Sequence, residues 1–440
     1  MVAVVEDVKY KARFVYAEDY GTGYFKYGPI TLGEVPRIMP SRGLLLRDLP
    51  ESMKLLVPRD VLSRGVVVGD EVSKYLSSLR DAIRNLKYPL HDGIVRREDE
   101  DAWRVVREMT RFTIAQFHSE AVKQSDYKGF LVVAALSALA PDYMKERFVE
   151  LHDDVNRELG GNAIRAVTVI DQPFAVAIAE KAVTCIVIEA GHGNTQVVPI
   201  SYGPIRDGIV ALNRGGAEAN AITREVLKDA GYGDLAKDDY VVEVVKREAG
   251  LIPRDLDEAI NKAKKEPGKY AVSVKVNPLV TIELKEYSWM RFLIGEILFN
   301  PNHEIFRSYT QQGRLTIEDV TIGDMVFHGE MSLSDAVISS VRRTPVEIQD
   351  KVLENIILSG GSFNWKTPPE GLRDVAVTSP EKVKIMISKL SPELAERVNV
   401  RLVNDPQFSV WKGSIVYGYA LPLNVKWNER TKEGWYFLNQ

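Results

Sequence analysis

The sequence has little cysteine, no long apolar run and no excess of charge of one sign. Its one cysteine, Cys185, excludes an internal disulfide and a zinc site built from cysteines. Cys185 lies in an apolar stretch, so we expect a small buried core side chain. The longest apolar run, residues 129–140, is too short to cross a bilayer, and residues 1–11 lack the apolar stretch of a signal peptide. We therefore expect a soluble cytoplasmic protein without membrane insertion.

The balance of charge points away from nucleic acids. The chain has 57 basic and 61 acidic residues, a net charge of -4, whereas proteins that bind nucleic acids by neutralising phosphates carry an excess of positive charge. Hydrophobic residues make up 45% of the 440 residues, which is enough for more than one core. Apolar strand-like segments alternate with helical ones along the chain. This alternation predicts an α/β protein with mixed sheets and at least two domains.

A short pattern occurs twice, at an offset of 170 residues (189 minus 19). Residues 19–23 read Asp-Tyr-Gly-Thr-Gly, and residues 189–193 read Glu-Ala-Gly-His-Gly. Each copy follows an apolar segment that we expect to be a strand, and each leads into a return strand. The four expected strands cover residues 13–18, 24–30, 183–189 and 195–201.

The repeat extends beyond the glycines, because Pro29 and Ile30 match Pro199 and Ile200 at the same offset. Two strand–turn–strand units with the same chemistry indicate two related domains that face each other.

The residue types of the repeated turns suit phosphate. A glycine-rich turn can direct several backbone N–H groups into one concavity, which binds anions. The acid at the head of each turn can hold a hydrated Mg²⁺ that bridges phosphate oxygens, and Lys26 adds a positive charge. A single turn of this kind is more often an ordinary hairpin, but two copies in register favour a phosphate clamp. The chain has no GxxxxGK[ST] loop and no Rossmann glycine spacing.

The blocks around these turns resemble actin, and among actins the crenarchaeal proteins known as crenactins. The order of the blocks along the chain carries the resemblance, which spans nearly all of it. The two glycine turns resemble actin's two phosphate loops, Ile357-Leu-Ser-Gly-Gly-Ser362 resembles its adenosine motif, and Ser409-Val-Trp-x-Gly-Ser414 resembles its second connecting segment. Three further blocks are similar, at residues 68–71, 88–95 and 291–301.

The resemblance implies an actin-like fold of the actin, heat-shock chaperone and sugar kinase ATPase superfamily. Two related α/β domains with mixed sheets would flank a nucleotide cleft, and each domain would have a smaller subdomain. The implied boundaries are 1–33, 88–179 and 409–440 for the large subdomain of the first domain, 34–87 for its small subdomain with a DNase-loop-like segment, 180–213 and 307–408 for the large subdomain of the second domain, and 214–306 for its small subdomain.

The resemblance also implies a site for ATP or ADP with Mg²⁺. Asp19 and Glu189 would organise the metal through water, and Gln172 would position the attacking water, with Glu189 also acting in catalysis. The implied phosphate contacts are Gly21, Thr22, Gly23, Lys26, Gly191, His192 and Gly193. The implied adenosine contacts are Gly216, Lys246, Gly360, Gly361, Ser362 and Trp365.

Several of these residues have a second interpretation. Gln172 precedes Pro173 and could simply begin a helix, although an uncharged amide can also orient a water for phosphoryl transfer. His192 could contact phosphate or contribute only its backbone N–H. Lys246 could be a solvated helix charge, and Trp365 could be a core residue. Gln196 replaces a histidine of eukaryotic actin.

The resemblance implies a cytoskeletal ATP hydrolase that assembles into helical filaments in the cytoplasm and works with accessory cytoskeletal proteins. Two alternatives remain open. One is a non-polymerising, actin-related nucleotide-binding scaffold. The other is a metabolite kinase of the same superfamily, for which the sequence offers no specific general base.

Overall fold

The chain folds into two compact units in a computed structural model that describes residues 2–47, 49–78, 85–323, 325–394 and 396–438. Unit 1 comprises Met1–Ala182 and Phe408–Gln440, and unit 2 comprises Val183–Gln407. The four subdomain boundaries expected from the sequence stay predictions. Parts of those expected subdomains, at positions 1, 48, 79–84, 324, 395 and 439–440, lie outside the described residues.

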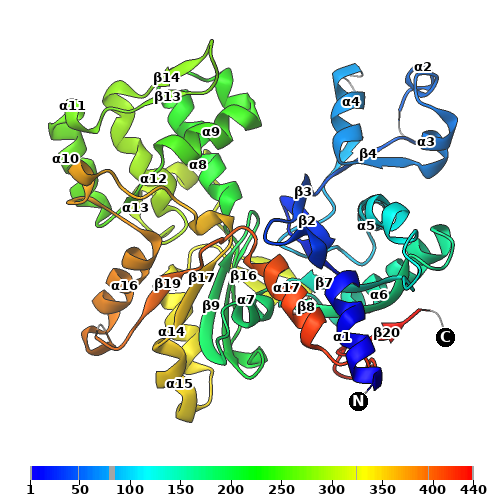
Figure 1. The fold of residues 1–440 in the computed structure, drawn as a ribbon. Coiled ribbons are helices and arrows are strands. Elements are labelled where there is room, and N and C mark those ends of the chain that lie inside the picture. The colour runs from blue at the N-terminus through cyan, green and yellow to red at the C-terminus, as the bar shows by residue number, and fades with distance from the viewer. Residues whose placement is uncertain (1, 48, 79–84, 324, 395, 439–440) are drawn as a thin grey trace. The chain divides into compact units, whose positions relative to one another are not determined.

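Unit 1 is built on a six-stranded mixed sheet (Figure 1). Three central strands run parallel, and the sheet continues antiparallel on both sides, through the second and third strands of the chain on one side and the C-terminal strand on the other. In spatial order the strands are β20 (Tyr436–Phe437), β8 (Ile164–Asp171), β7 (Phe130–Leu136), β1 (Val15–Tyr20), β2 (Tyr24–Pro29) and β3 (Arg37–Pro40).

Helices cover both faces of this sheet, and strand alternation decides which side chain of β1 meets which helix. Val15 faces α17, because a Cβ added at Gly418 of that helix would lie 2.9 Å from the Val15 side chain. Tyr16 and Tyr20 point to the other face, where their rings contact Phe117 of α5 and Phe148 of α6. The helices of unit 1 outside its small lobe are α1 (Val2–Phe14), α5 (Glu100–Ala121), α6 (Asp142–Glu158), α7 (Gln172–Ala179) and α17 (Ser409–Ala420).

The first strand begins later than its sequence suggests. We expected a strand from residue 13, but Arg13 and Phe14 form the last turn of α1, and β1 begins at Val15. The reason is that Phe14 continues a helical face: its ring lies 4.8 Å from that of Tyr10, four residues earlier. The Tyr10 hydroxyl donates to Gly129 O at 2.6 Å, which fixes the helix beside β7.

A small lobe of unit 1 has its own three-stranded sheet and apolar core. Its strands are β4 (Gly43–Leu45), β5 (Val66–Val68) and β6 (Leu86–Lys87), and its helices are α2 (Glu51–Lys54), α3 (Arg59–Arg64) and α4 (Asp70–Ser78). Leu44, Leu46, Val67 and Val72 are among the buried residues of this core. The sequence predicted a separate small lobe here, although its secondary structure was not assigned.

Unit 2 contains a seven-stranded sheet that repeats the order of the first one. The segment β19-β17-β9-β10-β11 corresponds to β8-β7-β1-β2-β3, with the same parallel and antiparallel pairings at each step. The strands are β15 (Val320–Ile322), β16 (Met325–His328), β11 (Val210–Leu212), β10 (Thr195–Ser201), β9 (Thr184–Ala190), β17 (Ile356–Ser359) and β19 (Val400–Leu402).

The register of the two hairpins is also repeated. Asp19 pairs with Lys26 and Tyr16 with Pro29 in the first hairpin. Glu189 pairs with Gln196 and Ile186 with Pro199 in the second. The duplication predicted from the offset of 170 is therefore present as two sheets of the same topology, and the expected α/β fold with mixed sheets is confirmed.

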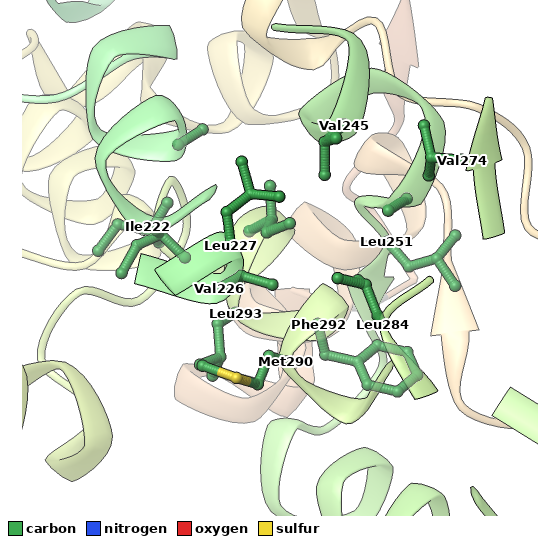
Figure 2. Packing of buried hydrophobic residues seen from close by; sticks show 14 of the residues in the cluster. Ile222, Val226, Leu227, Val245, Leu251, Val274, Leu284, Met290, Phe292 and Leu293 are labelled. Atoms are coloured by element: carbon green, nitrogen blue, oxygen red, sulfur yellow. The ribbon is translucent and has the colours of Figure 1, made fainter. Parts of the chain in front are cut away.

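The rest of unit 2 forms a helical part with a continuous apolar core, shown in Figure 2. Side chains from separate segments, such as Ile222, Val245, Leu284 and Phe292, converge there. The elements of this part are α8 (Gly216–Asp229), α9 (Asp239–Ala249), α10 (Leu256–Lys265), α11 (Pro267–Tyr270), α12 (Arg291–Glu296), α13 (Glu304–Gln311), and the two-stranded sheets of β12 (Ile252–Pro253) with β18 (Ala376–Val377) and β13 (Ser273–Lys275) with β14 (Thr281–Glu283).

Three helices pack against the seven-stranded sheet, namely α14 (Leu333–Arg342), α15 (Val346–Leu353) and α16 (Ser379–Leu390). Across the parts of both units that the structure describes, no helix is both long enough and apolar enough to cross a membrane.

Candidate functional site

The first hairpin brings Asp19, Lys26 and Gln172 together. Asp19 is the last residue but one of β1 and lies on the α17 face of the sheet, and Lys26 lies opposite it on β2. Lys26 Nζ lies 2.9 Å from Asp19 Oδ2, and Gln172 Nε2 donates to Asp19 Oδ1 at 2.8 Å. Gln172 is the first residue of α7, where Pro173 fits the first helical turn. The helix start suggested by the sequence is present, and it places Gln172 against the carboxylate.

The orientation of the Gln172 amide follows from its partners. Its Nε2 donates to Asp19 Oδ1 and, at 3.3 Å, to Tyr20 O. A carboxylate and a carbonyl can only accept, so the amide nitrogen must face them. The amide oxygen therefore points away from this pair and can accept a hydrogen bond.

The turn at residues 21–23 is shaped by close backbone contacts. A Cβ added at Gly21 would lie 2.7 Å from Tyr24 O and 3.4 Å from Lys26 Nζ, so only glycine fits this position without a shift. The turn is held from outside by Ser41, whose hydroxyl donates to Gly21 O at 2.6 Å and whose N–H donates to Gly23 O at 3.0 Å. Gly93 N donates to the hydroxyl of Thr22 at 3.0 Å.

Behind Asp19, on the other face of the sheet, lies a fully buried polar cluster. His152 Nε2 lies 2.8 Å from Glu18 Oε2, and both side chains are 0% exposed. His152 Nδ1 lies 2.6 Å from Phe148 O, and the Tyr20 hydroxyl donates to Glu18 Oε2 at 2.8 Å. These contacts tie β1 to α6 immediately beside the metal-ligand candidate.

The second hairpin places Glu189 and Gln196 opposite each other, both buried. Glu189 also pairs with Ser359 of the parallel strand β17. Gly191 N donates to Asn194 O at 2.9 Å and closes the turn. A Cβ added at Gly191 would meet only ordinary contacts, the nearest 3.7 Å away, so this turn is less restricted by sterics than the first.

The carbonyls of this turn are bound by the start of α8 and by a serine. Gly216 N donates to Gly191 O at 3.0 Å, and Ala217 N donates to His192 O at 2.8 Å. The Ser362 hydroxyl donates to the same Gly191 O at 2.6 Å. Two of the predicted adenosine residues, Gly216 and Ser362, thus lie directly against the second turn.

The imidazole of His192 is half-buried near Lys246. Burial lowers the pKa of His192 below its ordinary value, and the positive charge of Lys246 lowers it further. The ring is therefore neutral at pH 7. Lys246 itself is paired with Glu243, whose Oε2 lies 2.8 Å from Lys246 Nζ and whose Oε1 accepts from Asn220 at 2.7 Å.

The predicted adenosine residues after β17 adopt a conformation that needs glycine. Gly360 has φ +94°, and a Cβ there would lie 2.1 Å from Ala190 O. This contact brings Gly361 and Ser362 beside the second hairpin. Trp365 packs against both apolar cores of unit 2, and the edge of its ring fills the space where a Cβ at Gly250 would be, 2.5 Å away.

Trp365 also fits a ligand role in one respect. Its buried indole Nε1 has no hydrogen-bond partner among the described residues. A buried N–H of this kind is costly unless another group accepts from it. The structure is therefore compatible with both interpretations of Trp365, and its contact with adenosine stays a prediction.

Asp19 fits a metal that is held through water. Its two oxygens already accept from Lys26 and Gln172, and its side chain is 2% exposed. Among the residues that the structure describes, no group of three or more His, Cys, Asp or Glu residues could hold a metal ion. A divalent ion here would take its other ligands from water and phosphate oxygens. Asp19 and Glu189 lie in different units.

Sequence reasoning missed several residues of this arrangement. Ser41, Gly93 and Glu243 contact predicted site residues but lie in segments without a repeated motif. The Glu18–His152 pair spans 134 residues of sequence. Successive side chains of β1 point to opposite faces of the sheet, so Glu18 points away from Asp19. Only this alternation could have suggested that Glu18 has a buried partner on the other face.

Comparison with known proteins identifies a matching family and several relatives of this chain. The family described as Actin matches residues 281–420. Actin-related protein 3 of Drosophila melanogaster is 22% identical over 407 residues, which cover 90% of this chain and 88% of that protein. This chain has an actin-like fold.

The matches to two other actin-like relatives are shorter. Actin-related protein 3 of Saccharomyces cerevisiae is 25% identical over 191 residues, 43% of this chain and 37% of that protein. Actin-like protein ARP6 of Yarrowia lipolytica is 23% identical over 182 residues, 40% of this chain and 44% of that protein. The alignment thus spans less than half the length of these two relatives. All three are eukaryotic, so the closer relation to archaeal actins stays a prediction.

Proposed function

We propose that this actin-like protein binds ATP with Mg²⁺ through its two glycine hairpins and acts as an actin-related, non-polymerising nucleotide-binding scaffold. The observation that carries the proposal is the repeated hairpin. Two turns of the same register each begin at a buried carboxylate, on sheets of the same topology. Proteins with the actin fold generally bind nucleotide together with a divalent metal.

In unit 1, the chemistry of the turn supports phosphate binding. Lys26 Nζ lies beside Gly21, so its charge is available to an anion at the turn. Asp19 holds this ammonium in place and would orient the metal-bound water. When bound, Mg²⁺ supplies positive charge to the phosphate oxygens. Gly21, Thr22, Gly23 and Lys26 are the proposed β-phosphate contacts.

In unit 2, the proposed γ-phosphate residues are Gly191, His192 and Gly193; because Gly191 N already donates to Asn194 O, the N–H groups of His192 and Gly193 are the proposed donors. A neutral imidazole at His192 adds no charge, so the backbone N–H is its proposed contribution. The turn rests on the N-terminus of α8, whose first N–H groups bind the turn carbonyls. The proposed adenosine contacts are Gly216, Lys246, Gly360, Gly361 and Trp365, whereas Ser362, which the resemblance placed among them, donates its hydroxyl to the turn at Gly191 O.

Slow hydrolysis of ATP belongs to the same proposal. The oxygen of the Gln172 amide is directed away from Asp19 and can accept a hydrogen bond from a water molecule. Phosphoryl transfer to water depends mainly on position and electrostatics, so an oriented amide is sufficient. Gln172 is therefore the proposed water-positioning residue, and Glu189 would assist from the head of the second hairpin.

The relatives favour a scaffold over a filament. Relatives of this chain are named actin-related protein 3 and actin-like protein ARP6. Filament assembly with accessory cytoskeletal proteins is therefore our second candidate function.

The test of nucleotide binding is calorimetric titration with ATP in Mg²⁺. We expect one site per chain and an affinity at least about tenfold weaker after removal of Mg²⁺ with EDTA. Gly21→Ala should weaken the affinity for ATP by about tenfold or more. The Cβ of the alanine would lie 2.7 Å from Tyr24 O and distort the turn. Gly203→Ala is the matched control, since a Cβ at that turn glycine meets nothing within 4 Å. Absence of ATP binding by the unaltered protein would rule the proposal out.

A further inference from the structure

The two hairpins share a contact that the sequence repeat does not show. In each hairpin the carbonyl of the first glycine accepts a hydrogen bond from a serine hydroxyl at 2.6 Å, Ser41 on Gly21 O and Ser362 on Gly191 O. Gly21 and Gly191 occupy equivalent positions at the offset of 170. The two serines do not: they reach the carbonyls from segments of different secondary structure.

Ser41 is built into unit 1 as a fully buried residue. It is 1% exposed and directly follows β3, whose last residue, Pro40, pairs with Tyr24. Its backbone N–H donates to Gly23 O at 3.0 Å, so the serine binds the turn at two carbonyls. The side chain has little freedom to make a different contact.

Ser362 reaches the second turn from a short 3-10 helix, η6 (Gly361–Phe363). Gly360 allows this approach by its positive φ and its contact with Ala190 O. Gly191 O accepts from both Ser362 and Gly216 N, which uses the two lone pairs of that carbonyl.

Holding a carbonyl fixes the N–H that follows it. A trans peptide is planar, so its C=O and N–H point in opposite directions. With Gly21 O directed at Ser41, the N–H of Thr22 points away from Ser41. With Gly191 O directed at Ser362, the N–H of His192 points away from Ser362. Within the described part of the chain, no backbone carbonyl accepts a hydrogen bond from either N–H.

We propose that Ser41 and Ser362 are positioning residues that lock these two peptide planes, so that the Thr22 and His192 N–H groups are presented to the phosphates of the nucleotide. The inference rests on the proposed function. It adds that the orientation of one peptide plane in each turn controls phosphate binding. If a locked peptide flips, its carbonyl oxygen replaces the N–H and repels an anion at the turn. The serines thus decide whether each turn attracts or repels phosphate.

This role differs from a direct contact of Ser362 with adenosine, which its place in the adenosine motif predicted. A serine that binds adenosine affects every adenosine ligand. A serine that orients the phosphate turn affects only ligands that carry phosphates. The ratio of ATP affinity to adenosine affinity separates the two roles.

The experiment measures ATP and adenosine affinities of Ser362→Ala, Ser362→Thr and Ser41→Ala by calorimetry. We expect both alanine variants to lose about five- to tenfold in ATP affinity, which corresponds to one net hydrogen bond, with adenosine affinity unchanged. Ser362→Thr keeps the hydroxyl and should restore ATP binding. If Ser41→Ala does not fold, Ser41→Cys replaces it, because a thiol of similar size donates weakly.

The controls delete a serine hydroxyl that donates to a backbone carbonyl elsewhere in the same unit. Ser414→Ala serves for unit 1, where Ser414 donates to Val410 O at 2.9 Å, and Ser388→Ala serves for unit 2, where Ser388 donates to Lys384 O at 2.7 Å. Both should bind ATP like the unaltered protein.

The outcomes are distinct. If the unaltered protein binds ATP but the Ser41 and Ser362 variants bind it equally well, the positioning role is wrong and the proposed function stands. An equal loss of ATP and adenosine affinity overturns the role in favour of an adenosine contact. An unaltered protein that does not bind ATP overturns the proposed function itself.

Discussion

Gln172 shows how a single residue can acquire a role from its neighbours. The amide is 6% exposed, and its nitrogen is committed to two acceptors, Asp19 Oδ1 and Tyr20 O. In an isolated helix the same side chain would rotate. Here the carboxylate of Asp19 fixes which end of the amide faces a bound water. The direction of the amide oxygen therefore depends on Asp19 as well as on Gln172.

Removal of this amide should separate binding from hydrolysis. We expect Gln172→Ala to slow phosphate release in a single turnover by about 10² while ATP affinity changes less than about threefold, because misplacing a reactant costs rate more than binding. Gln349→Ala is the matched control, since Gln349 also donates to a backbone carbonyl, Thr344 O at 3.0 Å. An unchanged single-turnover rate would leave Gln172 with only the role of beginning α7.

At the scale of elements, α7 and α17 lie unusually close together. A Cβ added at Gly413 of α17 would lie 1.8 Å from Ala175 O of α7. The contact brings the helix that carries Gln172 against the helix that lies on β1 and β7. Glycine at this point of α17 therefore sets the distance on which the position of Gln172 depends.

Gly413→Ala tests this packing. We expect it to lower the free energy of unfolding by ~3 kcal/mol, because the backbone of α7 must move to admit the methyl group. The change would appear as an earlier midpoint of urea unfolding followed by circular dichroism. Val416→Ala is the control on the same helix, since Val416 is 45% exposed and should change stability by less than about 0.5 kcal/mol. Equal stability of both variants would contradict the close approach.

Whether the sequence predicts an element depends on whether the residues that define it are close together in the chain. The two hairpins were predictable, because apolar strands and glycine turns are local and occur twice. The start of β1 was not, since the helical face of Tyr10 and Phe14 is defined by packing against Gly129. Ser41 and Ser362 were beyond prediction as partners of the glycine carbonyls, because that contact depends on the register of β3 and on the backbone turn at Gly360.

At the scale of the whole molecule, the exposed apolar side chains are the feature relevant to self-association. The most exposed large apolar side chains of the described residues include Leu55, Tyr202, Leu279 and Val346, each at least 78% exposed. They come from segments far apart in the sequence. Scattered apolar residues are normal on a soluble surface, whereas a stable interface buries about 800 Å² on each partner.

Because we propose a non-polymerising scaffold, we expect no filaments. Purified protein should remain in the supernatant of a high-speed spin with ATP, with ADP and with a non-hydrolysable ATP analogue, over a range of salt and temperature. Negative-stain electron microscopy of the same samples should show single particles. ATP-dependent pellets that contain helical filaments would replace the scaffold proposal with the polymerising one and leave the nucleotide site unaffected.

The buried thiol of β9 offers an experimental advantage. Cys185 is 0% exposed, and burial raises its pKa to about 12, so it stays protonated and unreactive at neutral pH. It is also the only cysteine in the chain. A fluorophore or spin label attached through one engineered surface cysteine would therefore mark a single defined site in the native protein, without first preparing a cysteine-free background.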